Sequence, residues 1–482
     1  MKRVYTFLTA LMVSGMALAQ QPETPAPSQI AFTLDQCIEY ALKNNVTAEN
    51  ARVDREVADA RVKEFIGVGL PQISAGGSVV HNPQLSRFFM AYNPSSPFFP
   101  PGSAPAGVNN GDVIATRNIF QLQSSGDASA TVSQLIFNGS YIVGLQASSA
   151  FRQLAEKNEV QTNEQVIQGV MKAYYGVLIN RERTTLFDAN ISRVDSLLRN
   201  TTAMHQNGFA EGIDVDRIKV TRNNLLAERE TFLKINEIGE QVLKFQMNYP
   251  LDQPIGLVGS IQDIKIDTVL AHYSEGWDYR TRPDYQVLEA QHRMQELNLK
   301  NQYAGAFPVI AAFATGGYNT QSTNVSGVFQ TNTNIPNEGV LGPDKWYGYS
   351  RVGVSLSWSI FTGLSRTYKV QQEKLNLKKI DNGFRLLKSS INLETERASI
   401  FFQNALRTLQ IQKDNMDLAA NVVRITRIKY EQGVGSNIEV VDAENSLRTA
   451  QNTYYGAMFD AMIAKVDLDK AYNRLLAAAQ PK

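Results

Sequence analysis

Leu135-Ile136-Phe137-Asn138-Gly139 recurs later in the chain as Ser359-Ile360-Phe361-Thr362-Gly363, 224 residues further on. A second pair of motifs keeps nearly the same spacing, because Asn207-Gly208 recurs as Gln432-Gly433, 225 residues later. Solenoids and propellers repeat about every 20–50 residues, so a period this long indicates two copies of a whole structural half. The sequence therefore predicts two similar halves, each of which joins strands to long helices.

Residues of alternating polarity precede both copies of the first motif. In residues 120–136 one parity is largely apolar and the other polar, and the same alternation covers residues 351–360. An apolar-out, polar-in alternation is typical of a transmembrane barrel strand, although a soluble antiparallel sheet with one solvated face has the same pattern. We predict four barrel strands, at residues 72–80, 119–137, 307–318 and 347–361.

Four strands cannot close a membrane barrel. Such barrels have about eight strands or more, and an open sheet edge is not tolerated in lipid. We therefore expect at least two copies of the chain to share one barrel.

The N-terminus resembles a secretory signal. Lys2 and Arg3 precede an apolar run, and Ala17-Leu18-Ala19 fits the small-x-small cleavage rule, so residues 1–19 are predicted to be a signal peptide. Residues 20–31 are predicted to be a flexible leader that contains three prolines. No cysteine stands directly after the cleavage point, where a lipid anchor would need one, and no apolar run of about 18 residues follows in the mature chain. We expect a secreted chain that is either soluble or enters a membrane as a barrel.

Charge and cysteine content exclude several other classes. Removal of Lys2 and Arg3 changes the formal charge from +1 to −1, and this near neutrality gives no indication of a nucleic-acid partner. Cys37 is the only cysteine, so no internal disulfide is possible, and its apolar neighbours predict a small core residue.

The remainder of the chain is predicted to be helical. Thr33 and Gln36 form a capping box that begins a helix toward Phe65. Two helices are predicted between Gly139 and Met204, and a similar pair between Gly363 and Tyr430. The first half then covers residues 32–248 and the second residues 280–476, with a linker at 249–279 and a tail at 477–482.

The last helix has a continuous apolar seam whose steps alternate between three and four residues. This 3.5-residue period predicts a left-handed coiled coil with the preceding helix. The seam consists of Val440, Ala443, Leu447, Ala450, Tyr454, Ala457, Ala461, Ala464, Leu468, Ala471 and Leu475. The expected partner seam consists of Phe402, Leu406, Leu409, Met416, Ala420, Val423 and Tyr430.

These features together resemble the TolC-like outer-membrane efflux proteins. The resemblance is carried by Phe32-Thr33-Leu34, by the strand ends at residues 134–139 and 357–363, and by the two helix-hairpin turns. It implies a mainly α fold in which three chains share a 12-stranded barrel, with four strands from each chain, continued by a long coiled α-helical tunnel in the periplasm.

The resemblance also implies the function and the partners. The chain would be a homotrimeric exit duct in the outer membrane, surrounded by its lipid, for a tripartite efflux or type I secretion system. A periplasmic adaptor (membrane fusion protein) and an inner-membrane pump would be its partners. The resemblance implies no enzymatic activity and no cofactor.

The resemblance further assigns three groups of residues. The hairpin tips would contact the adaptor through Gly208, Phe209 and Ala210 and through Gly433, Val434 and Gly435, although ordinary turns between helices have similar residues. Glu439 and Asp442 would ring the closed tunnel end, although carboxylates in a first helical turn also suit a solvated face. Asp214 and Tyr430 match two positions of the closed-state lock and are expected to be hydrogen-bonded. Gly435 occupies a third lock position, where the family often has an arginine.

Enzyme chemistry has little support in the sequence. The four histidines are widely separated, no metal-spaced cluster is present, and the Gly-x-x-x-x-Gly-Lys and Gly-x-Ser-x-Gly signatures are absent. A second function remains open, that of a soluble periplasmic coiled-coil adaptor or scaffold. The sequence identifies neither the exported substrate nor the type of pump, and it assigns no role to the loops at 81–118 and 319–346.

Overall fold

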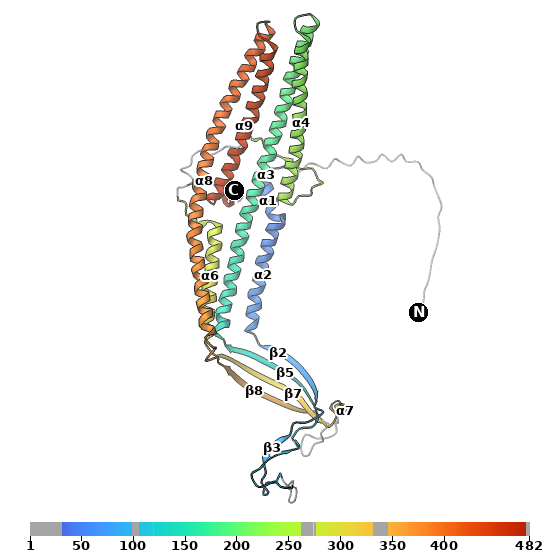
Figure 1. Cartoon of the computed structure of the whole chain (residues 1–482), viewed down its shortest axis with the longest axis vertical. Coiled ribbons are helices and arrows are strands. Elements are labelled where there is room, and N and C mark those ends of the chain that lie inside the picture. The colour runs from blue at the N-terminus through green and yellow to red at the C-terminus, as the bar shows by residue number, and fades with distance from the viewer. Residues whose placement is uncertain are drawn as a thin grey trace, which may run out of the picture.

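The computed structural model describes residues 31–98, 106–118, 120–261, 273, 276–330 and 346–478. The predicted signal peptide, the leader up to residue 30 and residues 479–482 of the tail lie outside these ranges. The described chain is elongated, with two helical hairpins at one end, a curved sheet toward the other, and a loop hairpin beyond the sheet (Figure 1).

Both halves contain the same succession of elements: a short helix, two long strands, a very long helix and a helix of about half its length. The first half consists of α2 (Val46–Val68), β2 (Gln72–His81), β5 (Ser124–Phe137), α3 (Gly139–Gln206) and α4 (Gly212–Met247). The second half consists of α6 (Pro283–Ala304), β7 (Val309–Ser322), β8 (Tyr347–Ser357), α8 (Ser365–Glu431) and α9 (Asn437–Ala471).

The very long helices are continuous, which corrects the prediction of two successive helices in each half. Helix α3 has 68 residues and α8 has 67, so each extends roughly 100 Å at about 1.5 Å per residue. Neither contains a proline that would remove a backbone donor and end the helix. Helix α3 instead changes partners along its length, from α2 and α6 near the sheet to α4 and α9 near the tips.

The first predicted helix is divided at Asn45. Helix α1 (Leu34–Asn44) begins with the expected capping box of Thr33 and Gln36, and α2 follows directly after Asn45. Asn45 has extended backbone angles, and its side chain accepts hydrogen bonds from the amides of Thr47 and Ala48. Since one asparagine ends α1 and caps α2, the chain bends there while the helical pattern of the sequence continues.

The four long strands form one antiparallel sheet in the order β2-β5-β7-β8. Strand β5 begins at Ser124, later than the predicted residue 119, because its pairing with β2 ends at His81. Strand β7 extends to Ser322, beyond the predicted 318, since it pairs with β5 along that whole length. Strand β8 ends at Ser357, before the predicted 361, where its partner β7 begins at Val309.

The sheet has one apolar and one polar face in register across all four strands. Ile73 pairs with Val132, Val132 with Ala314, and Ala314 with Val352, and all four side chains are exposed. The adjacent row belongs to the other face and consists of Ser74, Thr131, Thr315 and Arg351. Since β2 and β8 are the edges of this sheet, the described part of the single chain contains an open sheet and no closed barrel.

The shorter elements cover the middle and the loop end of the molecule. Strand β1 (Ala31–Phe32) pairs with β6 (Gly256–Leu257), so the last leader residue and part of the predicted linker are ordered together. Strands β3 (Phe88–Ala91) and β4 (Val113–Thr116) form a hairpin beyond the sheet. The remaining elements are α7 (Val325–Val328), the 3₁₀ helix η2 (Tyr279–Thr281) and α10 (Leu475–Ala478).

The second hairpin packs along an apolar seam, with two differences from the prediction. Eight of the eleven predicted seam positions of the last helix are buried and the other three are partly buried. This helix ends earlier than expected, because α9 stops at Ala471 and the last seam position, Leu475, lies on α10. On α8, however, Ala420 is exposed and Ala419 packs beside Val423, Ala443 and Leu447. The buried stripe of α8 therefore runs through Met416, Ala419 and Val423. Its residues are still spaced by three and four, but the stripe passes through Ala419 and not through the predicted Ala420.

The largest hydrophobic core lies in the middle of the molecule. It joins α1 to the central part of α3, the C-terminal ends of α4 and α9, and the strands β1 and β6. Cys37 is fully buried in it, as the sequence predicted. Over the described ranges, no helix is long and apolar enough to span a membrane.

Candidate functional site at the hairpin tips

Both hairpins reverse direction through turns of the same geometry. Residues 207–211 connect α3 to α4, and residues 432–436 connect α8 to α9. Gly208 and Gly433 have φ angles of 79° and 75°, in the left-handed region that glycine adopts most readily. Each turn is closed two residues after the helix cap, where the amide of Phe209 donates to Met204 and that of Val434 donates to Lys429, at 2.8 and 3.0 Å.

The tips present one large apolar side chain each. Phe209 and Val434 occupy matching positions after the turn glycines and are 80% and 79% exposed. The two turns end a pair of hairpins that project side by side from the molecule (Figure 1). Single exposed apolar side chains are common on protein surfaces, so the adaptor-contacting role of these residues stays a prediction.

Gly435, which departs from the arginine often found in the family, has a local packing role. A Cβ atom at this position would lie 3.0 Å from the Lys429 Cβ and 3.1 Å from the Tyr430 backbone nitrogen. The equivalent residue of the first hairpin is Ala210, whose carbonyl oxygen lies 2.9 Å from His205 Nδ1. The second turn is therefore closed more tightly against its own helix, and a larger residue at 435 would require the turn to shift.

The two predicted aperture carboxylates lie together at the start of α9. Glu439 and Asp442 are separated by three residues, so they occupy the same side of the helix, and both are exposed. Ser436 caps the helix by accepting a hydrogen bond from the Glu439 amide, which places Glu439 in the first turn. Within the described part of the chain, neither carboxylate has an ion-pair partner.

The first hairpin provides a comparison, because its residues correspond at the 225-residue offset. Asp214 corresponds to Glu439, and Arg217 corresponds to Asp442. Asp214 and Arg217 form an ion pair of 3.5 Å within α4. One hairpin therefore neutralises its first-turn carboxylate internally, whereas the other has two unpaired carboxylates at the equivalent positions.

The predicted lock residues have other partners within the single chain. The hydroxyl of Tyr430 is buried and lies 3.3 Å from the hydroxyl of Thr201 on α3. The Asp214 carboxylate pairs with Arg217, while its backbone carbonyl accepts a hydrogen bond from Asn437 Nδ2 at 2.9 Å. The described contacts of the single chain do not include a Tyr430–Asp214 hydrogen bond, and that bond stays a prediction.

Polar links that were not predicted from the sequence join the two hairpins. Asn437 is buried at the beginning of α9, and its counterpart in the first hairpin is Gly212, so the repeat itself gave no indication of its role. Further along, Asn190 Nδ2 donates to Gln451 at 2.9 Å and Arg193 contacts Glu444 at 3.3 Å, all between α3 and α9.

A second polar cluster lies far from the tips, where α9 ends and α6 begins. Arg282 is buried and contacts Asp284 at 2.9 Å, Glu394 at 2.8 Å and the Ala471 carbonyl at 3.1 Å. Glu164 of α3 is buried beside this cluster, and its Oε1 has no hydrogen-bond partner. Burial raises the pKa of the Glu164 carboxyl to about 7, while the charge of Arg282 opposes the shift.

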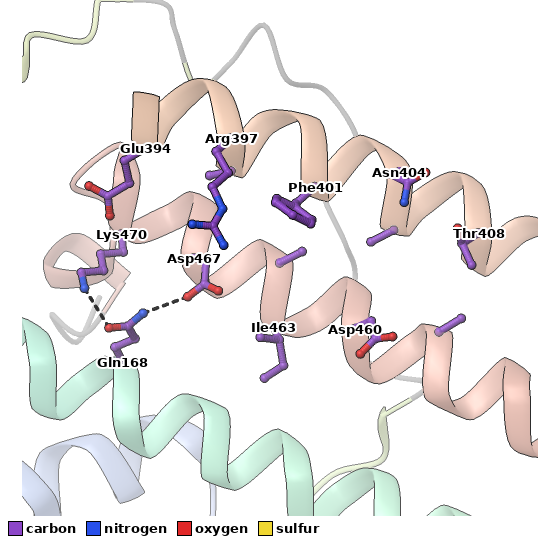
Figure 2. Close-up of a pocket in the computed structure, with 14 residues that line it drawn as sticks. Gln168, Glu394, Arg397, Phe401, Asn404, Thr408, Asp460, Ile463, Asp467 and Lys470 are labelled. Atoms are coloured by element: carbon purple, nitrogen blue, oxygen red, sulfur yellow. Dashed lines mark hydrogen bonds between the residues drawn. The ribbon is translucent and has the colours of Figure 1, made fainter. Parts of the chain in front are cut away.

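A groove of about 600 Å³ adjoins this cluster between α8 and α9. Figure 2 shows Gln168 of α3 at its end, where its side chain donates to Asp467 at 2.8 Å and accepts from Lys470 at 3.1 Å. The groove contains charges of both signs and apolar side chains such as Phe401. Within the described residues, no three His, Cys, Asp or Glu side chains are grouped to hold a metal ion.

Comparison with known proteins agrees with this architecture. Residues 280–474 match a family model described as "Outer membrane efflux protein". No curated protein sequence matches the chain. Similar solved structures include CusC, described in terms of transmembrane channel formation, with a TM-score of 0.70, 14% identity, and 94% of this chain and 98% of that chain covered.

Two further structures extend the comparison. VceC of Vibrio cholerae has a TM-score of 0.65 and 13% identity, with 91% of this chain and 95% of that chain covered. The open state of the MtrE channel of Neisseria gonorrhoeae has a TM-score of 0.67 and 15% identity, with 93% and 91% covered. At these identities the likeness establishes the fold.

The resemblance to the TolC-like outer-membrane efflux proteins is thus confirmed. The family match and the fold together support an outer-membrane efflux channel, a class of transport protein and not of enzymes.

Proposed function

We propose that three copies of the chain form an exit duct across the outer membrane and into the periplasm, within a tripartite efflux or type I secretion system. One observation carries this proposal. The four-stranded sheet exposes an apolar row on one face and a polar row on the other, and it continues into helices of roughly 100 Å. Lipid outside and water inside would satisfy both faces, and the helices would extend the duct into the periplasm.

The sheet edges support the shared barrel. β2 and β8 are the edges of the sheet, so their outer N–H and C=O groups have no partner strand. In lipid each such group would cost several kcal/mol, because no water is present to hydrogen-bond it. Pairing of β8 in one copy with β2 in the next removes both edges. Three copies then supply the twelve strands that the resemblance implies.

Exposed apolar stripes on the helices also support association of copies. On α8 the stripe follows steps of seven and eleven residues and consists of Leu386, Leu393, Ile400, Ile411, Leu418 and Ile425. On α4 a second stripe consists of Ile235, Ile238, Val242 and Phe245. Apolar surface of this extent is unusual on a monomer and is typical of helix faces that pack together.

The tips would form the controlled end of the duct. Three copies would place six carboxylates, from Glu439 and Asp442, around one axis, and an acidic ring favours cations. Mutual repulsion of these unpaired charges would assist opening once the hairpins begin to separate. The exposed Phe209 and Val434 are the apolar contacts that an adaptor would bind.

The energy for export would come from other components. The sequence contains no Gly-x-x-x-x-Gly-Lys phosphate-binding motif, so this chain gives no sign of hydrolysing nucleotide. An inner-membrane pump, coupled through the periplasmic adaptor, would provide the driving force and choose the cargo. The chain itself would supply the passage.

Two measurements on detergent-purified protein test the proposal. Native mass spectrometry should give the mass of three chains, and single-channel recording in a planar bilayer should show discrete steps that multivalent cations reduce from the tip side. A protein that remains soluble without detergent and never inserts would contradict the duct. That result would instead support the soluble periplasmic adaptor or scaffold.

A further inference from the structure

The four long strands contain very little charge. In the sequences of β2, β5, β7 and β8, Arg351 is the only lysine or arginine and Asp127 is the only acidic residue. Both have odd residue numbers, and odd-numbered residues of β5, β7 and β8 pair with one another, so both share the polar face with Ser129, Thr131 and Ser355. The polar face of the four strands therefore carries one cation and one anion, and each dominates the potential in its own neighbourhood.

Arg351 extends from a row of short side chains. It pairs across the sheet with Thr315, which pairs with Thr131, and the two threonine hydroxyls are hydrogen-bonded at 2.9 Å. Arg351 is exposed, and within the described part of the chain its guanidinium has neither a hydrogen bond nor an ion pair. Five N–H donors are therefore available to a solute on this face.

Asp127 does not neutralise this arginine. Its carboxylate accepts hydrogen bonds from Tyr349 at 2.8 Å and from Ser129 at 3.3 Å. Asp127 pairs with Asn319, which lies four residues along β7 from Thr315, the partner of Arg351. Four residues of a strand extend roughly 14 Å, which exceeds the screening length of about 10 Å at 0.1 M salt.

We propose that Arg351 forms an anion-attracting ring inside the strand-built part of the duct. The inference rests on the proposed function, which places the polar face of three sheets around one aqueous lumen. Three guanidinium groups at one level would attract chloride and would contact carboxylate or phosphate groups of passing cargo in the bidentate manner of arginine. The duct would then combine a cation-favouring tip with an anion-favouring barrel.

Reversal potentials in a gradient of dilute KCl test this ring. The parent protein should carry Glu439→Gln and Asp442→Asn, so that the tip no longer selects cations. In this background, Arg351→Gln should lower the ratio of chloride to potassium permeability by about twofold, since one of the few fixed charges of the strand-built part of the lumen is removed. Arg351→Lys should retain the parent ratio, because it retains the charge.

Two controls share the polar face. Ser355→Gln introduces a longer uncharged side chain four residues along β8 and should leave the ratio unchanged, whereas Asp127→Asn should raise it. An unchanged ratio in Arg351→Gln channels of normal conductance would overturn the ring and leave the duct intact. Failure of every variant and of the parent to form channels would overturn the duct itself, and the ring with it.

Discussion

Glu164 lies buried where α3 meets the Arg282 cluster, and one of its carboxyl oxygens has no hydrogen-bond partner. Its pKa is raised from 4.5 to about 7 because burial disfavours the charged form. The folded protein therefore binds this proton more tightly than the unfolded chain does. Its contribution to stability is complete below about pH 4.5 and is lost as the pH rises through about 7.

The Glu164→Gln variant should therefore be more stable than the parent protein at pH 8 and similar to it at pH 5. Glutamine cannot ionise, so the variant avoids a cost on the order of 3 kcal/mol that the buried carboxylate incurs at high pH. Thermal unfolding followed by circular dichroism at both pH values measures the difference. Glu156→Gln, at a partly exposed carboxylate that pairs with Arg152 on the same helix, should show no such pH dependence. An equal gain at pH 5 and pH 8 would contradict the assignment.

Replacement of the two tip carboxylates, Glu439 and Asp442, by amides should weaken the block of the channel by multivalent cations. Glu439→Gln with Asp442→Asn removes the unpaired charges of the proposed ring, and we expect at least a tenfold weaker block, equivalent to about 1.4 kcal/mol. Single-channel recordings with added trivalent cations measure it. Asp216→Asn removes an exposed carboxylate of the first hairpin that contacts Lys219 and serves as the control. Equal loss of block in both variants would place the cation site elsewhere.

Individual residues were predictable where a local rule applies to them. The capping box of Thr33 and Gln36 follows from spacing alone, and the turn glycines Gly208 and Gly433 follow from the repeat. Glu164 and Asn437 were not predictable, because their importance arises from burial against elements far away in the sequence. A carboxylate on a helix has the same sequence pattern whether water or another helix covers it.

At the scale of elements, the coiled-coil period of α8 was predicted correctly and its phase was wrong in part. Ala419 packs against the α9 seam, whereas Ala420 is exposed. Ala419→Glu should destabilise the hairpin by about 1–3 kcal/mol because a charge enters an apolar seam. Ala420→Glu, the neighbouring control, should change the unfolding midpoint little. A similar loss in both variants would show that both faces of α8 are buried in the assembly.

Strand and helix boundaries depended on pairing that the sequence does not display. Strand β5 begins where β2 ends, and β8 ends where β7 begins, so each limit is set by a neighbour distant in the chain. The long helices were divided in the prediction because the buried face of α3 changes where its partners change. A change of partner and a break in a helix disturb the apolar period in the same way.

At the scale of the whole molecule, the two hairpins are joined near their tips by a small number of polar links. Thr201 contacts Tyr430, and Asn437 donates to the Asp214 carbonyl, between α3/α4 on one side and α8/α9 on the other. Opening of the duct would require these hairpins to separate. In the proposed duct these links would therefore oppose opening in each chain, in place of the salt bridge that an arginine at position 435 would provide.

Removal of both links should favour the open duct. Thr201→Val with Asn437→Ala deletes two hydrogen bonds worth about 2 kcal/mol together, which would shift the equilibrium between closed and open states roughly thirtyfold. Bilayer conductance should rise accordingly. Asp214→Ala distinguishes the two forms of lock, because it removes the carboxylate and keeps the carbonyl that Asn437 contacts. Unchanged conductance in Asp214→Ala, with a rise in the double variant, assigns closure to the backbone link. A rise in Asp214→Ala alone would instead assign closure to the carboxylate and favour the predicted hydrogen bond with Tyr430.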